Sequence, residues 1–123
     1  MTSGETRRGP GEEDYCHLTT AGRVTARPHR IEIWFALEGS TVYLLAGGGT
    51  RADWVRNLVA EPAVTLELAG RRYSARARVV RDEDEARAAR QLLYDKYRRG
   101  YQGSLERWRD EALPVAVELH EPP

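Results

Sequence analysis

The sequence predicts a small antiparallel β-barrel with helices packed on its outside, a mainly β fold of the α+β kind. Three observations favour this class. Short segments alternate between apolar and polar residues, tight turns join several of them, and only three segments have helical spacing. The expected order is three strands, a helix, two strands, two helices and a strand. That order does not resemble the regular strand–helix alternation of a doubly wound parallel sheet.

The first half of the chain contains three expected strands and one helix. A short strand over residues 16–20 ends before Gly22. The next strand covers residues 30–37, where Ile and Phe side chains alternate with polar and small ones. A turn at residues 38–40 predicts a hairpin with the strand 42–46. Residues 52–60 have apolar side chains four positions apart, which predicts a helix ending before Pro62.

The second half begins with two further strands, at residues 64–68 and 73–79. The second of these alternates strictly and carries arginines on its outer face. Asp82 is expected to cap a long helix that runs to Arg98. Ser104 is expected to begin a short helix, and residues 115–119 form the last expected strand.

The composition indicates one soluble globular domain. The chain has 123 residues, 41% hydrophobic content and a formal net charge of +0, which gives no global attraction to nucleic acid. We expect a flexible tail over residues 1–14 and a single domain over residues 15–121. The sequence contains no run of about 20 apolar residues, so no membrane anchor is expected. Cys16 is the only cysteine, which favours a reducing, cytoplasmic location.

Two glycine-containing turns are the most informative feature. Gly22-Arg23 follows the first strand, and Gly47-Gly48-Gly49 follows the third; Trp54 and Asn57 come shortly after. Glycine turns beside regular elements present backbone N–H groups to anions. The combination suits a cofactor with a phosphate at one end and a flat ring at the other.

No side chains of the sequence form a recognisable catalytic motif of their own. The three histidines are scattered and have no zinc-site spacing, so no metal site is expected. Nucleophile-elbow, phosphate-loop and dinucleotide-binding patterns do not occur. An enzyme of this kind would take its chemistry from a bound organic cofactor.

Several pieces of the chain, in their order and spacing, carry a family resemblance. They are Thr19-Thr20-Ala21-Gly22-Arg23, Pro28-His29-Arg30, Gly47-Gly48-Gly49, Asp53-Trp54-Val55-Arg56-Asn57-Leu58 with Pro62, and Leu113-Pro114-Val115-Ala116-Val117 after Trp108. These pieces resemble the deazaflavin-dependent nitroreductase and quinone reductase family, over about residues 16–119. The resemblance implies a split antiparallel β-barrel of the FMN-binding, pyridoxamine-phosphate-oxidase-like type. It also implies coenzyme F-420, a deazaflavin that carries a hydride to a small-molecule acceptor.

The resemblance also implies roles for individual residues. Backbone amides from Thr19 to Arg23 would hold the cofactor's phosphate and acidic tail, and Trp34 with Glu32, on the inner face of its strand, would lie near the ring. Tyr97 and Tyr101 are the candidates for donating to the acceptor. The full set expected around the cofactor is Thr19, Thr20, Gly22, Arg23, Val24, His29, Arg30, Glu32, Trp34, Ala46, Gly47, Gly48, Gly49, Trp54 and Asn57.

Two departures from the family pattern leave alternatives open. Val24 stands where relatives often have a lysine, and Ala26 stands where the motif ends in glycine. The loss of the lysine at Val24 keeps a non-catalytic ligand-binding module open as an alternative, and an FMN-dependent reductase on the same barrel is the second alternative. A monomer and a homodimer are both compatible with the sequence.

Overall fold

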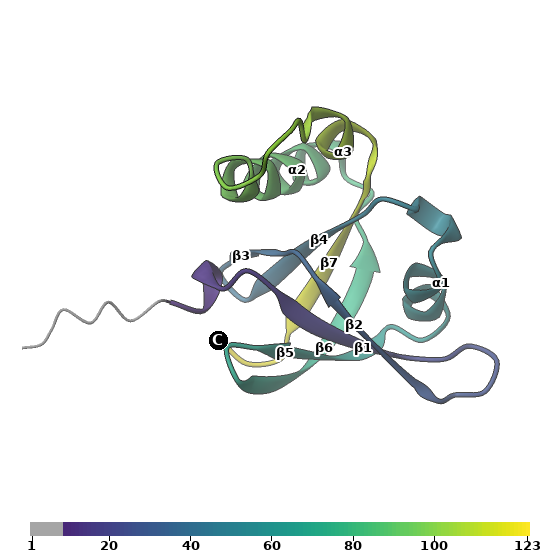
Figure 1. The fold of residues 1–123 in the computed structure, drawn as a ribbon. Helices are drawn as coiled ribbons and strands as arrows, with labels where there is room; N and C mark the ends of the chain where they lie inside the picture. Colours follow the sequence, from purple (N-terminus) through teal and green to yellow (C-terminus); the bar gives the residue numbers. More distant parts are fainter. Residues whose placement is uncertain (1–8) are drawn as a thin grey trace, which may run out of the picture.

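The computed structural model describes residues 9–123, which form one curled seven-stranded sheet with three helices (Figure 1). Every pair of neighbouring strands is antiparallel, in the spatial order β2-β1-β5-β6-β7-β4-β3. The antiparallel barrel expected from the sequence is therefore confirmed. The strands are β1 (Cys16–Ala21), β2 (Pro28–Ile33), β3 (Ala36–Glu38), β4 (Thr41–Ala46), β5 (Ala63–Leu68), β6 (Arg71–Val79) and β7 (Leu113–Leu119).

The helices are α1 (Asp53–Ala60), α2 (Glu83–Tyr97) and α3 (Glu106–Glu111), with short 3-10 turns η1 (Pro10–Glu12) and η2 (Gly49–Arg51). In Figure 1, α2 and α3 lie together on one side of the sheet, whereas α1 lies near the loop that joins β1 to β2. Asp82 caps α2 as expected, because its carboxylate accepts a hydrogen bond from the Glu85 N–H at 2.8 Å.

Strand β4 is buried on both faces and separates two apolar layers. Val42 and Leu44 face the inside of the curled sheet, which α1 closes with Leu58. Tyr43 and Leu45 face the opposite way and pack in the layer that α2 and α3 cover. The two layers explain why β4 is apolar at nearly every position rather than at alternate ones.

The single strand expected over residues 30–37 is wrong, because the chain bends at Trp34 and Phe35. The Phe35 N–H donates to the Tyr97 hydroxyl at 3.0 Å, and the Phe35 carbonyl accepts from Lys96 at 2.9 Å. The Phe35 carbonyl also lies 3.0 Å from the Tyr97 hydroxyl, whose single proton it shares with the Asp14 carbonyl. These side chains satisfy the backbone groups that a continuing strand would pair with a neighbour. As a result, β2 pairs with β1 and β3 pairs with β4, so the expected hairpin is confirmed only for β3 and β4.

The tail expected over residues 1–14 falls partly outside the described residues, since the structure describes the chain from Gly9. The described part contains η1, which lies against β3. Two side chains at the end of α2 bind the next two residues: Lys96 donates to the Glu13 carbonyl, and Tyr97 to the Asp14 carbonyl. Within residues 9–123, none of the helices has the length and apolar character needed to cross a bilayer.

Candidate functional site

The loop between β1 and β2 is closed by its own backbone. The Gly22 N–H donates to the Arg27 carbonyl at 2.8 Å, and the Ala26 N–H donates to the Gly22 carbonyl at 2.8 Å. A Cβ on Gly22 would lie 2.7 Å from the His29 Nε2 and 3.0 Å from the Arg27 carbonyl oxygen, so a larger residue would require the His29 ring and the loop to shift. Ala26 has a φ of 63°, the left-handed region in which the related motif has glycine. Because the Gly22 and Ala26 amides have internal partners, this loop presents fewer free N–H groups than the sequence suggested.

Arg23 extends from this loop to α1. Its Nη1 donates to the Asn57 Oδ1 at 2.8 Å, and its Nη2 lies 3.2 Å from the Asp53 Oδ1. Asn57 also accepts from the Arg23 backbone N–H at 3.3 Å and donates through Nδ2 to the Thr20 hydroxyl at 3.2 Å. Asn57 is only 2% exposed, so its polar atoms are satisfied by these bonds rather than by water. It therefore joins β1, the loop and α1.

A cleft of about 230 Å³ opens beside Arg23 and the first turn of α1. The residue before the helix, Ala52, provides no side-chain cap, so the first N–H groups of α1 lack a side-chain acceptor. A cation beside an uncapped helix N-terminus favours a bound phosphate or carboxylate. Asp53 competes for the guanidinium, but its side chain is 82% exposed and held only at the surface. The cleft is lined by Gly22, Arg23, Val24, Thr25, His29, Asp53 and Asn57.

The three glycines after β4 differ in what the fold requires of them. Gly49 has a φ of 59°, which the turn into η2 requires. Gly47 has open space where a Cβ would lie, so packing does not explain the glycine there. Ala46 ends β4 and is 2% exposed, and Trp54 is partly buried against the core. Gly47 and Gly49 both leave room for a ligand to approach the backbone, and only at Gly49 does the backbone conformation also require glycine.

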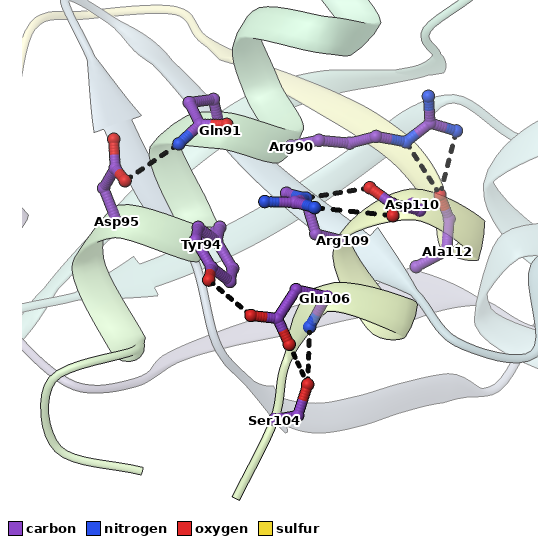
Figure 2. Close-up of polar contacts among 9 residues, drawn as sticks. All are labelled: Arg90, Gln91, Tyr94, Asp95, Ser104, Glu106, Arg109, Asp110 and Ala112. Atoms are coloured by element: carbon purple, nitrogen blue, oxygen red, sulfur yellow. Dashed lines mark hydrogen bonds and ion pairs between the residues drawn. The ribbon is translucent and has the colours of Figure 1, made fainter.

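An aromatic cluster surrounds Trp34 at the bend after β2. Its ring stacks on Tyr97 with centroids 4.2 Å apart, and Tyr101 and Trp108 meet it edge-on at 5.9 and 5.5 Å. Trp108 belongs to α3, which two contacts hold against α2 (Figure 2). There Tyr94 donates to Glu106 at 2.9 Å, and Arg90 donates to the Ala112 carbonyl.

The two tyrosines proposed as donors have different environments. The Tyr97 hydroxyl is engaged with the backbone of Asp14 and Phe35, and burial raises the pKa of this phenol. Tyr101 is 46% exposed, and its hydroxyl has no hydrogen-bond partner among residues 9–123. Tyr101 is therefore the one of the pair whose hydroxyl is free to meet a ligand.

Four polar residues of β1 and β2 lie on the open face of the sheet, namely His17, Thr19, Arg30 and Glu32, whereas Thr20 is buried against Asn57. Arg30 binds both carboxylate oxygens of Glu67 at 3.1 and 3.2 Å, which lowers the pKa of Glu67, and Thr19 is the strand partner of Arg30. His17 lies 3.3 Å from Glu32. The expectation that Glu32 shares an inner face with Trp34 is wrong, because Glu32 is exposed and the bend after Ile33 turns Trp34 toward α2.

Two clusters of predicted site residues therefore lie at opposite ends of β2, with Thr19, Arg30 and Glu32 on the strands between them. The Arg23 cleft lies at one end and the Trp34 cluster at the other. Six strand residues separate them, or about 20 Å at roughly 3.3 Å per residue. The sequence reasoning missed Lys96, which binds backbone carbonyls beside the aromatic cluster; its signal was that it is the only lysine among 19 basic Lys and Arg residues.

Comparisons with solved structures support the barrel. The chain superposes on a protein described as an F420 reductase with a TM-score of 0.65 and 22% identity, over 93% of each chain. A pyridoxamine 5'-phosphate oxidase-like protein from Listeria innocua gives a TM-score of 0.66 and 13% identity, over 91% of this chain and 88% of the other. A protein described as a domain-swapped dimer gives a TM-score of 0.68 and 18% identity, over 85% of this chain and 79% of the other. At these identities the likeness shows the fold.

The family comparison covers nearly the whole sequence. Residues 2–120 match the family described as F420H(2)-dependent quinone reductase. The match agrees with the motifs that surround the Arg23 cleft. The chain belongs to the F420H(2)-dependent quinone reductase family and is an oxidoreductase.

Proposed function

We propose that this protein transfers a hydride from reduced coenzyme F-420 to an electron-poor acceptor such as a quinone, an enone or a nitro compound. One observation carries the proposal: Arg23 lies beside the uncapped N-terminal turn of α1, in a cleft next to the loop that the family motif predicts for cofactor binding. This arrangement fits the phosphate and the acidic tail of the cofactor.

Each group of residues would then have a separate task. Arg23, the first amides of α1 and His29 would bind the anionic part, and Gly47 would allow it to approach the backbone. The bound deazaflavin would supply the hydride. At the far end of β2, Trp34 and Tyr101 would orient a flat acceptor and exclude water from it, with the Tyr101 hydroxyl available to donate to the oxygen that becomes negative.

A titration with reduced or oxidised coenzyme F-420 tests the proposal directly. Arg23→Ala should weaken binding about tenfold or more, because it removes a charge-assisted hydrogen bond. Arg27→Ala is the matched control, since Arg27 is in the same loop and its hydrogen bonds are made by its backbone. Equal affinity of the unmodified protein, Arg23→Ala and Arg27→Ala for the cofactor would show that the Arg23 cleft is not part of the binding site.

The same titration with FMN separates the proposal from an ordinary flavin reductase. Tight binding of FMN and none of coenzyme F-420 would replace the proposed cofactor. Binding of reduced coenzyme F-420 without its oxidation by a broad panel of acceptors would indicate a non-catalytic binding module. The likeness to a protein described as a domain-swapped dimer supports a homodimer, which sedimentation analysis would test.

A further inference from the structure

Two consecutive side chains at the end of α2 join three distant parts of the chain. The Lys96 Nζ lies 2.7 Å from the Glu13 carbonyl and 2.9 Å from the Phe35 carbonyl. The Tyr97 hydroxyl lies 2.8 Å from the Asp14 carbonyl and 3.0 Å from the same Phe35 carbonyl. The segment before β1, the bend after β2 and the end of α2 are thus fixed to one another at one point.

Burying the lysine ammonium at this point costs desolvation free energy, which argues that the residue has a specific structural role. Lys96 is half-buried and makes no bond to a carboxylate among residues 9–123; burial lowers the pKa of its ammonium group to about 8, opposed by Cys16, Asp14 and Glu13. The ammonium also lies 3.6 Å from the centre of the Phe35 ring. A compact group with three rotatable donors can meet two carbonyls and a ring face together, whereas the planar fork of arginine is suited to a single carboxylate.

The joined segments are the walls of a pocket of about 280 Å³ beside the aromatic cluster. Asp14 and Tyr15 come from the segment before β1, and Trp34 comes from the bend. The remaining lining residues are Lys96, Tyr97, Gly100 and Tyr101, from the end of α2 and the loop after it. Without the segment before β1, this pocket would lose one side.

We propose that Lys96 is a positioning residue for the acceptor: by binding the carbonyls of Glu13 and Phe35, it holds residues 13–15 in place as a wall of the acceptor pocket. The acceptor part of this inference rests on the proposed function. The part of the inference in which Lys96 holds the segment is independent of the proposed function, because it follows from the hydrogen bonds alone.

The test compares Lys96→Met with a matched control, Arg99→Met. Methionine keeps an unbranched apolar stem and removes the donors, and Arg99 is an exposed cation three positions further along the chain. A glutamate-specific protease, followed by mass spectrometry of the products, reports how accessible the bonds after Glu12 and Glu13 are. Cofactor affinity and the acceptor KM and kcat are measured on the same proteins.

Lys96→Met should accelerate cleavage after Glu12 and Glu13 about tenfold and raise the acceptor KM by a similar factor, the effect expected from lost hydrogen bonds to a charged group. Cofactor affinity should stay within about twofold, because the Arg23 cleft lies at the other end of β2. Arg99→Met should change none of these. Cleavage and KM both within about twofold of the unmodified protein would overturn the proposal.

Tyr15→Ala provides a second test that leaves the Lys96 bonds in place. It removes a wall side chain that is 48% exposed, so the domain should remain folded. The acceptor KM should rise while cleavage after Glu13 stays unchanged; an unchanged KM would refute the role of the segment as a wall. Failure of the unmodified protein to bind coenzyme F-420 would refute the proposed function instead, and the protease comparison would still decide whether Lys96 holds the segment.

Discussion

Replacing Asn57 by alanine should destabilise the protein, although Asn57 is on a short helix where alanine is the better helix former. Asn57 is 2% exposed and makes three hydrogen bonds, two to Arg23 and one to Thr20. The bond to the Arg23 guanidinium is charge-assisted, and loss of such a bond costs about 1.5–3 kcal/mol when the partner is left buried. The two remaining bonds contribute about 1 kcal/mol each.

Two effects reduce this sum. The Arg23 side chain is 32% exposed, so water replaces part of its lost bond, and alanine gains about 0.5 kcal/mol in helix propensity. The net expectation for Asn57→Ala is a loss of about 2–3 kcal/mol of unfolding free energy. This corresponds to a melting temperature lower by about 10 °C. The domain should remain folded at 25 °C, because domains of this kind have about 5–15 kcal/mol to lose.

Urea and thermal unfolding measure the effect, with Arg56→Ala as the control. Arg56 is the adjacent exposed position on α1, and its Nε bonds only the Thr50 carbonyl at 3.2 Å. A double-mutant cycle with Thr20→Val isolates the buried bond between Asn57 and Thr20. The reasoning is refuted if Asn57→Ala and Arg56→Ala differ by less than about 0.5 kcal/mol.

Three further changes have defined outcomes. Val24→Lys, at a position 88% exposed on the rim of the cleft, should tighten coenzyme F-420 binding about two- to fivefold at low salt, and an unchanged titration would contradict this. Ala26→Gly should raise the unfolding free energy by about 0.5 kcal/mol, because the φ of 63° strains alanine; a lower melting temperature would contradict it. The pKa of Lys96 is lowered to about 8 by burial, so between pH 8 and 10.5 the unfolded chain binds more protons there, and this residue adds stability as pH rises. Burial raises the pKa of Cys16 and of Tyr43 to about 12, so these two groups make the folded state less stable as pH rises. Without the opposing contribution of Lys96, the free energy of unfolding of Lys96→Met should therefore fall more steeply with pH than that of the unmodified protein. Parallel pH profiles of the two proteins in chemical unfolding would exclude the Lys96 contribution.

The sequence predicts those elements whose cause lies within a few residues. From Arg72 to Arg78, strand β6 alternates between exposed and buried positions because one of its faces meets the core, and that alternation is visible in the sequence. The cap of α2 by Asp82 and the end of α1 before Pro62 are equally local. In contrast, the bend at Phe35 is caused by Lys96 and Tyr97, more than 60 positions later. The alternating pattern of side chains continues through this bend, so no local signal marks it.

The site residues divide in the same way, into those with a local signal in the sequence and those placed by distant contacts. The family motifs identify Gly22-Arg23 and Asn57 as important, but their contact depends on the placement of α1 against the end of β1, which is a tertiary arrangement. The opposite directions of Glu32 and Trp34 follow from the bend and could not be read from a continuous strand. Lys96 was visible only as an oddity of composition, because its partners are backbone carbonyls that have no residue-specific signature.

The contacts of Arg23 are compatible with both roles that the proposal gives this side chain, as part of a buried network and as a contact for an anionic ligand. One edge of the guanidinium is held by Asn57, which is buried and bonded on its other side to Thr20. The other edge meets Asp53, whose side chain is 82% exposed, and such surface pairs are worth only about 0–1 kcal/mol. In the proposed site, an anionic ligand would displace Asp53 at little cost while Asn57 keeps the guanidinium in place. Because the geometry would be set before the ligand arrives, little of the binding free energy would be spent on ordering Arg23.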